Sequence, residues 1–506
     1  MKLLTRMSGE QRRLILGLVI VFAVAIALRA NIGWSFSNNG IDEGVMLQRS
    51  LLVSHGYELY TEIPCDQAPL AFLAGSIFGG DVVSLRSLSA VLSLTAIAAC
   101  IVATRKLGSD RAMIVTGVLM ATDFVFLRES RLFSLDGMTA SLLAISIVAL
   151  VPYLKSNNRL SLAVGSLTIG IAASVKLLGV LALGGLLVLL IFEMYNERSK
   201  WKARTLDLVI AAVAAAIPLL ALMLFLGPSE VIDGMLFGQA SRGFDLYLKL
   251  SLLAYFGINF AYIIPLLYSR RIWALGRPER FLLCSSFVMI AFMVVQPLIF
   301  LHHMAIMSPF LAVLTGLFLK DFLYHEKAVP NVAHDAIRSK KDIRRMAIAV
   351  ALVVINLTVS ISLGTYGVIT QGEPLEIVYA RELRALTHEG DWVVSGSPII
   401  ASYAGRMIPP EVVNVAYRQS PDLTEEILEN AILDYDVAVV VICYRLSEFE
   451  ALPSFLQAHN YSIVVPDLVQ GEKAVLDLFQ EGIGSVTFCI KTDIAAARGI
   501  PVVQAF

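Results

Sequence analysis

The stretch at residues 38–70, NNGIDEGVMLQRSLLVSHGYELYTEIPCDQAPL, decides the fold of this chain. It lies between two long apolar runs, and a turn signal at residues 38–40 precedes the paired carboxylates Asp42 and Glu43. Asp42 is well placed to cap a helix that Gly56 stops. Apolar and polar residues alternate along this helix at helical spacing, as expected of a helix in a membrane interface. Two carboxylates on such a helix predict chemistry at the edge of a bilayer.

The composition identifies a membrane protein. Over 506 residues, 57% are hydrophobic and only 16% are charged, and the mean hydropathy is +0.73. These values exclude an ordinary soluble protein. The five cysteines form no CxxC pair, which argues against a structural zinc site; they are Cys65, Cys100, Cys284, Cys443 and Cys489.

A membrane span needs about 20 mostly apolar residues. The sequence predicts about eleven such spans, of which the tightly spaced pair at 160–194 is the weakest. The first run follows several basic residues and could be a cleaved signal peptide, but the many later spans favour a first membrane anchor. The predicted spans are 14–34, 82–104, 111–127, 137–154, 160–175, 177–194, 207–227, 248–269, 280–300, 303–322 and 345–366.

Basic residues predict the orientation of these spans, because loops rich in Lys and Arg stay in the cytoplasm. Alternate loops, on the same side as the N-terminus, carry most of them: 105–111, 155–159, 198–204, 270–280 and 320–345. The opposite loops contain few, mainly Arg49, Arg128, Arg131 and Arg242. We therefore expect a cytoplasmic N-terminus, with the Asp42 loop and all residues after about 366 outside the cytoplasm.

The last part of the chain has a different pattern. Short apolar runs at 391–395, 437–442 and 462–465 read as strands, and the amphipathic segments 424–435 and 448–459 read as helices. This alternation predicts a small α/β layer with parallel strand pairing. We therefore expect a transmembrane domain at 1–366 and an extracytoplasmic α/β domain at 367–506. The latter has no GxGxxG or GxSxG motif and is predicted to be a packing or acceptor-positioning domain.

The topology brings several polar residues to the outer membrane face. Ionisable residues there are often functional, because a charge in lipid costs about 2.5–3.5 kcal/mol on insertion scales. Simpler roles stay open for each: the acids can cap helices, the basic side chains can reach up to the headgroups, and the histidines can be structural. The candidates are Asp42, Glu43, Arg86, Arg131, Asp136, Lys176, His302 and His303.

Several of these residues lie in motifs with a family resemblance. Asp42-Glu43, GYELY at 56–60 and QAPL at 67–70 resemble the first outer loop of GT-C membrane glycosyltransferases. The closest groups are the protein O-mannosyltransferase-like (family 39) enzymes and the lipid A aminoarabinose transferases. Further similar segments follow in the expected order: LRSLSA at 85–90, RLFSLD at 131–136 and the histidine-to-proline segment at 302–310.

The resemblance implies a polytopic helical membrane protein of the GT-C fold that transfers a sugar from a polyprenyl-phosphate carrier. The acceptor would be a hydroxyl on a protein, lipid or glycan outside the cytoplasm, and no nucleic acid is involved. The reaction would be inverting, with Asp42 as the base and Glu43 orienting the acceptor or Asp42 itself. Asp136 would bind the acceptor or the sugar. The implied phosphate partners are Arg86, Arg131, Lys176, His302 and His303.

The chain departs from the family pattern at two positions. Gln67, which we also predict to bind substrate, stands where many relatives have the lysine of a Lys-Pro-Pro-Leu motif. A cation expected near the donor is therefore missing or supplied elsewhere. Gly137 follows the second-loop acid in place of a polar residue, which puts the role of Asp136 in question. A divalent metal is possible, because relatives differ in their need for one, although the sequence shows no ligand cluster.

Two other classes of function compete with a transferase. A secondary transporter or flippase for a lipid-linked sugar would be expected to show inverted repeats and charges near the bilayer midplane. No repeat is visible here, and the charges gather at one outer edge. A non-catalytic assembly partner with the same fold is the third possibility, against which the Asp42-Glu43 pair argues.

Overall fold

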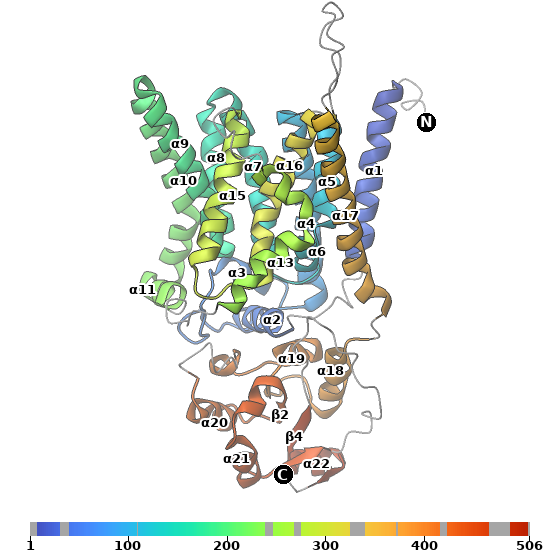
Figure 1. Cartoon of the computed structure of the whole chain (residues 1–506). Helices are drawn as coiled ribbons and strands as arrows, with labels where there is room; N and C mark the ends of the chain where they lie inside the picture. The colour runs from blue at the N-terminus through green and yellow to red at the C-terminus, as the bar shows by residue number, and fades with distance from the viewer. Residues whose placement is uncertain are drawn as a thin grey trace, which may run out of the picture. The chain divides into compact units, whose positions relative to one another are not determined.

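The structure is a computed structural model (Figure 1) that describes residues 8–30, 40–108, 110–237, 246–267, 275–323, 340–370, 373–414, 423–464 and 486–503. The chain forms two compact units. Unit 1 comprises Met1–Ile32, Ser87–Phe225 and Gly243–Thr370, and unit 2 comprises Gly33–Arg86, Leu226–Arg242 and Gln371–Phe506. Some predicted features lie outside the described residues: the first two residues of the predicted turn, Arg242, residues 270–274 of the predicted basic loop 270–280, and residues 324–339 of the predicted basic loop 320–345.

Unit 1 is helical. Its segments are apolar enough to be buried in a bundle or to face lipid, and an Asp or Asn side chain caps the start of two of them. Its α-helices are α1 (Gly9–Arg29), α4 (Val82–Leu107, whose first turn belongs to unit 2), α5 (Asp110–Thr122), α6 (Phe124–Glu129), α7 (Leu135–Ser156), α8 (Arg159–Val175), α9 (Leu181–Asn196), α10 (Trp201–Leu226), α13 (Leu250–Ile258), α14 (Ile263–Leu267), α15 (Arg277–Val295), α16 (Ser308–Leu323) and α17 (Lys340–Thr370).

Apolar helix lies at each of the eleven predicted spans. Within the described residues, seven helices are long and apolar enough to cross a membrane, or eight if a bent pair counts as one span. That pair, Tyr247–Ile258 and Phe260–Leu266, bends by 92° at Asn259, so the span predicted at 248–269 is broken. Three others are shorter than a full span: Ala112–Thr122, Arg159–Val175 and Ala351–Leu363. The span predicted at 111–127 ends early because Asp123 caps the separate helix α6.

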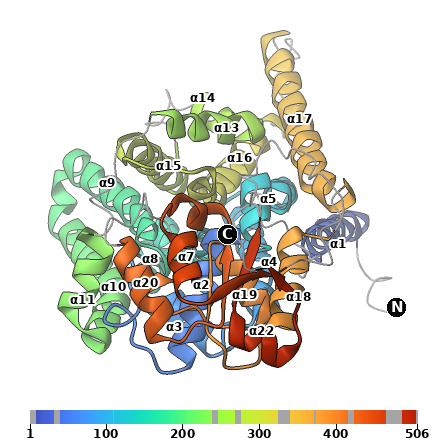
Figure 2. The same ribbon diagram turned by 90° about the horizontal axis from the view of Figure 1, so that it is seen from below.

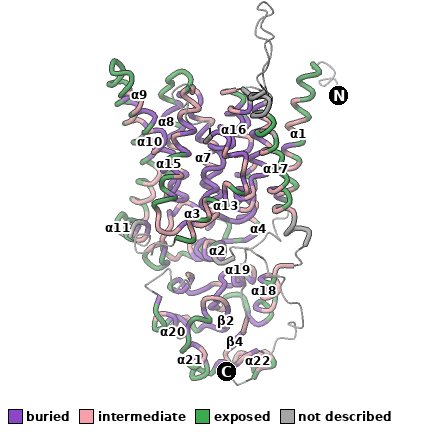
Figure 3. The backbone as a smooth tube through the Cα atoms, in the orientation of Figure 1, coloured by how far each residue is buried: buried purple, intermediate pink, exposed green. Residues whose placement is uncertain are grey.

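The core of unit 1 surrounds α7 and α16, which are coloured mostly as buried in Figure 3. α7 packs against α8, and α9 packs against α15. α1 and α10 are largely exposed in the structure, as expected of helices whose apolar surface faces lipid. α5 contacts both α1 and α17, which lie at one edge of unit 1 (Figure 2).

Unit 2 contains the stretch at residues 38–70. Helix α2 (Gly40–Ser54) ends just before Gly56, whose φ of 95° suits glycine and stops the helix as predicted. Asp42 lies in the first turn of α2 and not at its N-cap. The other helices of unit 2 are α3 (Leu70–Ser76), α11 (Pro228–Ile232), α18 (Leu375–Leu386), α19 (Pro398–Ala404), α20 (Glu425–Asp434), α21 (Leu452–Ala458) and α22 (Thr492–Arg498).

The sheet of unit 2 has five strands, in the order β1-β2-β4-β3-β5. The three predicted strands are present, but only β1 and β2 pair in parallel; β2–β4, β4–β3 and β3–β5 are antiparallel. The predicted parallel pairing is therefore confirmed for β1 and β2, whereas β3 runs in the same direction but is separated from β2 by the unpredicted strand β4. The apolar strand β4, with buried Phe488, Cys489 and Ile490, inserts between β2 and β3 and satisfies the backbone of both. The strands are β1 (Val393–Ser395), β2 (Val439–Ile442), β3 (Tyr461–Val464), β4 (Thr487–Lys491) and β5 (Val502–Val503).

Candidate active site

The adjacent acids of α2 have opposite environments. Asp42 is exposed, whereas only 3% of the surface of Glu43 is accessible. Successive residues on an α-helix point about 100° apart, so one acid can face solvent while the next faces the core. Both lie in the first turn of α2, where the helix dipole favours negative charge. Asp42 is therefore accessible to a reactant, whereas the Glu43 side chain is buried inside unit 2.

Glu43 pairs with Arg86, which lies in the first turns of α4. The Arg86 Nε donates to Glu43 Oε1 at 2.8 Å, and a terminal nitrogen donates to Oε2 at 2.5 Å. Both side chains are almost fully buried, and the Arg86 guanidinium also lies 5.4 Å from the ring centroid of Tyr403. Burial raises the pKa of Tyr403 to about 12, so its phenol stays neutral beside this pair. A bidentate pair of this kind fixes both side chains strongly.

Helix α2 also carries a cation, Arg49, that contacts the loop after the helix and was not among the predicted site residues. Arg49 is buried, pairs with Asp66 at 3.4 Å and donates to the Pro64 carbonyl at 2.8 Å. Asp66 in turn accepts from the side-chain amide of Gln67 at 3.3 Å. Arg49 therefore brings a positive charge close to Gln67, the position where many relatives have a lysine. Its spacing, 18 residues before Gln67 on another element, gave no signal in the sequence.

A second polar group lies in unit 1, where Asp136 meets Lys176. Asp136 is in the first turn of α7, and Lys176 directly follows α8. A tight turn at Asn157 and Asn158 joins these two helices, which pack against each other. The chain therefore reverses, and the end of α8 lies beside the start of α7. The Lys176 ammonium donates to Asp136 Oδ2 at 2.7 Å, and both side chains are mostly buried.

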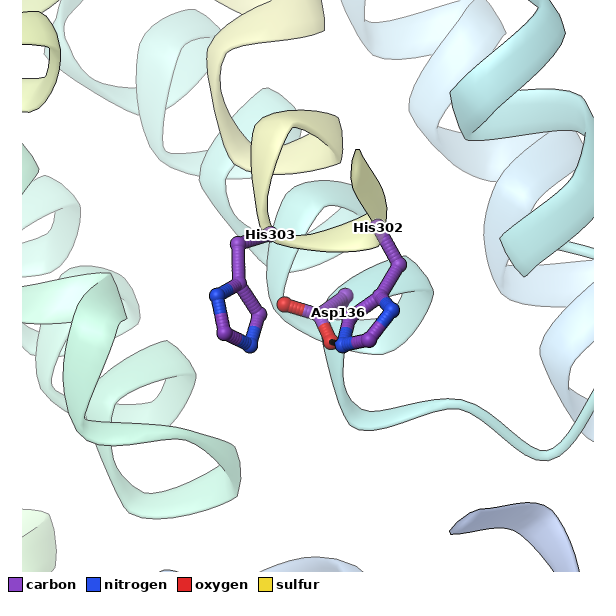
Figure 4. Close-up of side chains that lie close together, drawn as sticks. All are labelled: Asp136, His302 and His303. Atoms are coloured by element: carbon purple, nitrogen blue, oxygen red, sulfur yellow. Dashed lines mark ion pairs between the residues drawn. The ribbon is translucent and has the colours of Figure 1, made fainter. Parts of the chain in front are cut away.

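His302 and His303 join this ion pair from the short helix Leu301–Met307 that precedes α16 (Figure 4). His302 Nε2 lies 3.9 Å from Asp136 Oδ2, and the two imidazole rings meet edge-on with centroids 4.5 Å apart. His303 Nδ1 accepts from the Phe300 backbone N–H at 3.3 Å. A neutral His303 therefore carries its proton on Nε2 and is a hydrogen-bond donor there.

These residues can be tested as a metal site. Ligand atoms of Asp136, His302 and His303 lie within 4.8 Å of one another, and such oxygen and nitrogen donors suit zinc. Asp136 Oδ1 is also buried without a hydrogen-bond partner among the described residues. However, Asp136 already forms an ion pair with Lys176. His303 Nδ1 already accepts a hydrogen bond from a backbone N–H. The arrangement fits the ion pair better than it fits a metal ion.

Arg131 has a different local role. It is buried between α6 and α7, and its Nε donates to the Leu28 carbonyl near the end of α1 at 2.6 Å. Burial lowers the pKa of Arg131 to about 10. The contact satisfies a carbonyl at a helix C-terminus, which favours nearby positive charge. A contact of Arg131 with phosphate stays a prediction.

The predicted site residues thus form two groups within the described residues. Asp42, Glu43, Arg86 and Gln67 belong to unit 2, and the structure brings Glu43 and Arg86 together. Arg131, Asp136, Lys176 and the two histidines belong to unit 1, and the structure brings Asp136, Lys176 and the histidines together. Sequence reasoning missed Arg49 and Tyr403; Tyr403 lies more than 300 residues from its partner and left no sequence signal.

Comparisons with known proteins identify the fold. Residues 70–231 match the family model of dolichyl-phosphate-mannose-protein mannosyltransferases. ArnT from Cupriavidus metallidurans in the apo state is similar over 96% of this chain and 99% of its own, with a TM-score of 0.65 and 13% identity. Its complex with undecaprenyl phosphate is similar over 94% and 98%, with a TM-score of 0.60 and 13% identity.

An archaeal protein has a similar fold. The oligosaccharyltransferase AglB from Archaeoglobus fulgidus, in complex with an inhibitory peptide and a dolichol-phosphate, is similar over 90% of this chain and 73% of its own. The TM-score is 0.56 and the identity 16%. No curated protein sequence matches the chain. At these identities the likeness establishes the fold, and the resemblance predicted from the motifs is confirmed at that level.

Proposed function

Because this chain is an integral membrane protein with the GT-C fold of membrane glycosyltransferases, we propose that it transfers a sugar from a polyprenyl-phosphate carrier to an acceptor hydroxyl. The acceptor lies outside the cytoplasm, on the side where the sequence places the Asp42 loop and the C-terminal residues. The lipid tail of the donor stays in the bilayer and its phosphate lies at the interface. Similar structures that contain undecaprenyl phosphate or a dolichol-phosphate support this donor class.

Asp42 is the proposed base. The observation that carries this assignment is the contrast within α2, where Asp42 is exposed while neighbouring Glu43 is buried against Arg86. An exposed carboxylate can take the proton of an acceptor hydroxyl as that oxygen attacks the anomeric carbon. The bond from the anomeric carbon to the phosphate oxygen breaks in the same step, which inverts the configuration at that carbon. Glu43 and Arg86 then support Asp42 from within unit 2.

The polyprenyl phosphate leaves as an anion and needs fixed positive charge or hydrogen-bond donors. Lys176, held by Asp136, and the adjacent histidines offer such donors in unit 1. Arg49, beside Gln67, offers another in unit 2. Each of these cations is already oriented by a carboxylate, so little reorganisation is needed when the phosphate binds. Asp136 also offers a carboxylate oxygen to a sugar or acceptor hydroxyl.

The test of this function is a transfer assay with the Asp42→Asn variant. Purified full-length protein is incubated with radiolabelled polyprenyl-phosphate sugars and extracted acceptor fractions, and the consumption of each donor is measured. We expect the wild-type protein to consume at least one donor and Asp42→Asn to lose about 10²-fold or more in rate, as expected for removal of a general base.

The matched control is Glu58→Gln, because Glu58 is an exposed acid in the loop that follows α2. It should retain activity within about twofold, since surface substitutions of this kind disturb little. Full activity of Asp42→Asn would exclude Asp42 as the base. The absence of donor consumption by the wild-type protein with every carrier sugar and acceptor fraction would exclude the transferase itself.

One observation favours a second candidate, transport of the lipid-linked sugar. The pair of helices bent by 92° at Asn259 resembles the discontinuous helices of transporters. Asn259 is fully buried and its side-chain amide has no hydrogen-bond partner among the described residues. A transporter would move the labelled donor across a vesicle membrane without consuming it and would tolerate Asp42→Asn.

A further inference from the structure

Helix α19, from the C-terminal part of the chain, packs directly on α2 within unit 2. The two helices come close together at Gly44, which is buried. A Cβ atom at this position would lie only 2.2 Å from the backbone nitrogen of Ile399. Any other residue at position 44 would therefore push the two backbones apart. The residue after the Asp42-Glu43 pair is thus a contact point for α19.

Gln48 makes a second contact, one helical turn further along the same face of α2. Its side-chain nitrogen donates to Ser402 Oγ at 3.1 Å and to the Arg406 carbonyl at 2.9 Å. Its side-chain oxygen accepts from the Ile408 backbone N–H at 3.0 Å. Gln48 is fully buried. Three directional hydrogen bonds to one segment fix both the rotation and the height of α2, which apolar packing alone would not do.

Tyr403 makes the third contact, through the ion pair. Its ring faces the Arg86 guanidinium at 5.4 Å while Arg86 holds Glu43 with two hydrogen bonds. A cation above an aromatic face is attracted by the ring, and more strongly where water is excluded. Helix α19 therefore contacts α2 directly, and it also contacts Arg86, the ion-pair partner of the buried Glu43 of α2.

We propose that residues 398–408 are a positioning element that fixes α2 and so orients the carboxylate of Asp42, an inference that rests on the proposed function. Gly44 and Gln48 contact this element directly, and Glu43 is linked to it through Arg86 and Tyr403. Asp42, the residue before Glu43, remains exposed. Tyr403 and Gln48 are positioning residues, since they act through α2. The C-terminal part of the chain thereby contributes to transfer without contributing a reacting group.

The experiment compares two substitutions of Tyr403 in the full-length protein. Tyr403→Leu removes the ring above Arg86, and Tyr403→Phe keeps it. Tyr379→Leu is the matched control: Tyr379 is a half-buried tyrosine of α18, outside residues 398–408, and its ring lies against Phe488 of β4. Two quantities are measured for each variant, the kcat and KM for the donor, and the rate of amide hydrogen exchange along α2.

We expect Tyr403→Leu to lower kcat by about tenfold or more with a KM within about twofold, because misplacing a reacting group by an ångström is that costly. Amide exchange along α2 should become faster in the same variant. Tyr403→Phe and Tyr379→Leu should match the wild-type protein in both quantities. Gln48→Leu should resemble Tyr403→Leu.

Two results would overturn the proposal: unchanged exchange along α2 in Tyr403→Leu, whatever happens to kcat, or faster exchange with an unchanged kcat. Failure of the proposed function is recognised separately, because it shows in the wild-type protein as the absence of donor consumption. If Tyr403→Leu does not fold, the milder Ser402→Ala, which removes one acceptor of Gln48, is measured in its place by the same criteria.

Discussion

At the scale of single residues, the buried ion pair of Glu43 and Arg86 makes the sharpest prediction about stability. Both side chains are almost fully buried and joined by two hydrogen bonds. Removing one partner leaves the other charge buried and unpaired, which costs about 3–5 kcal/mol in other proteins. We therefore expect Glu43→Gln and Arg86→Met each to lower the thermal unfolding midpoint of the purified protein clearly.

A double variant separates the loss of the charges from the loss of packing. Glu43→Leu combined with Arg86→Met removes both charges and keeps most of the volume, so it should be more stable than either single variant. It should nevertheless lack normal transfer activity, since α2 loses its bidentate anchor. Equal or additive destabilisation in the double variant would contradict the view that an unpaired charge is the main cost.

At the scale of elements, regular patterns in the sequence carried most of the information. Apolar length located a helix at each of the eleven predicted spans, although only seven, or eight with the bent pair, are long enough within the described residues to cross a membrane. The Asp-Glu motif with Gly56 located α2. Neighbours that are distant in the chain were not predictable: β4 enters between β2 and β3, and Tyr403 reaches Arg86 across more than 300 residues. The sequence named most members of both polar groups but not Arg49 and Tyr403, and only the fold shows which residues pair.

The turn between α7 and α8 supports a prediction at the same scale, because it sets Lys176 against Asp136. Lys176→Met removes the cation and leaves a buried carboxylate without its main partner. We expect kcat/KM for the polyprenyl-phosphate donor to fall by about 10²-fold, as for loss of one preorganised electrostatic contact. The measurement is the transfer assay over a range of donor concentrations.

Lys249→Met is the control for this prediction. Lys249 is also a half-buried cation of unit 1, and it donates to the backbone carbonyls of Met293 and Gln296. Its replacement should leave kcat/KM within a few-fold of the wild-type value. If both variants lose activity equally, the effect comes from general loss of positive charge and not from the pair with Asp136.

At the scale of the whole molecule, the chain combines a bundle of apolar helices with a unit whose sheet contains buried thiols. Cys443 and Cys489 are free and buried next to or within the central strands β2 and β4. Burial raises the pKa of each thiol to about 12. The same cause raises the pKa of Tyr435, which packs against Trp392 in unit 2, to about 12. These groups all favour the protonated form in the folded protein.

This common direction predicts that unit 2 becomes less stable at alkaline pH. An unfolded cysteine loses its proton near pH 8.5, whereas the folded thiols keep theirs until about pH 12. Between these values the folded state binds more protons, so its stability falls as the pH rises. We expect the unfolding midpoint of unit 2 to drop by roughly 5 °C or more between pH 8 and pH 11.

Fluorescence of Trp392 can follow this transition in a variant in which the three other tryptophans are phenylalanine. The variant that also carries Cys443→Ala and Cys489→Ala has no thiol to titrate in the sheet, so its midpoint should depend on pH less steeply, even if it is less stable at pH 8. An equal slope in both proteins would show that other groups, such as Tyr435, control the alkaline transition. A midpoint that rises with pH would contradict the protonated state that burial imposes on these thiols.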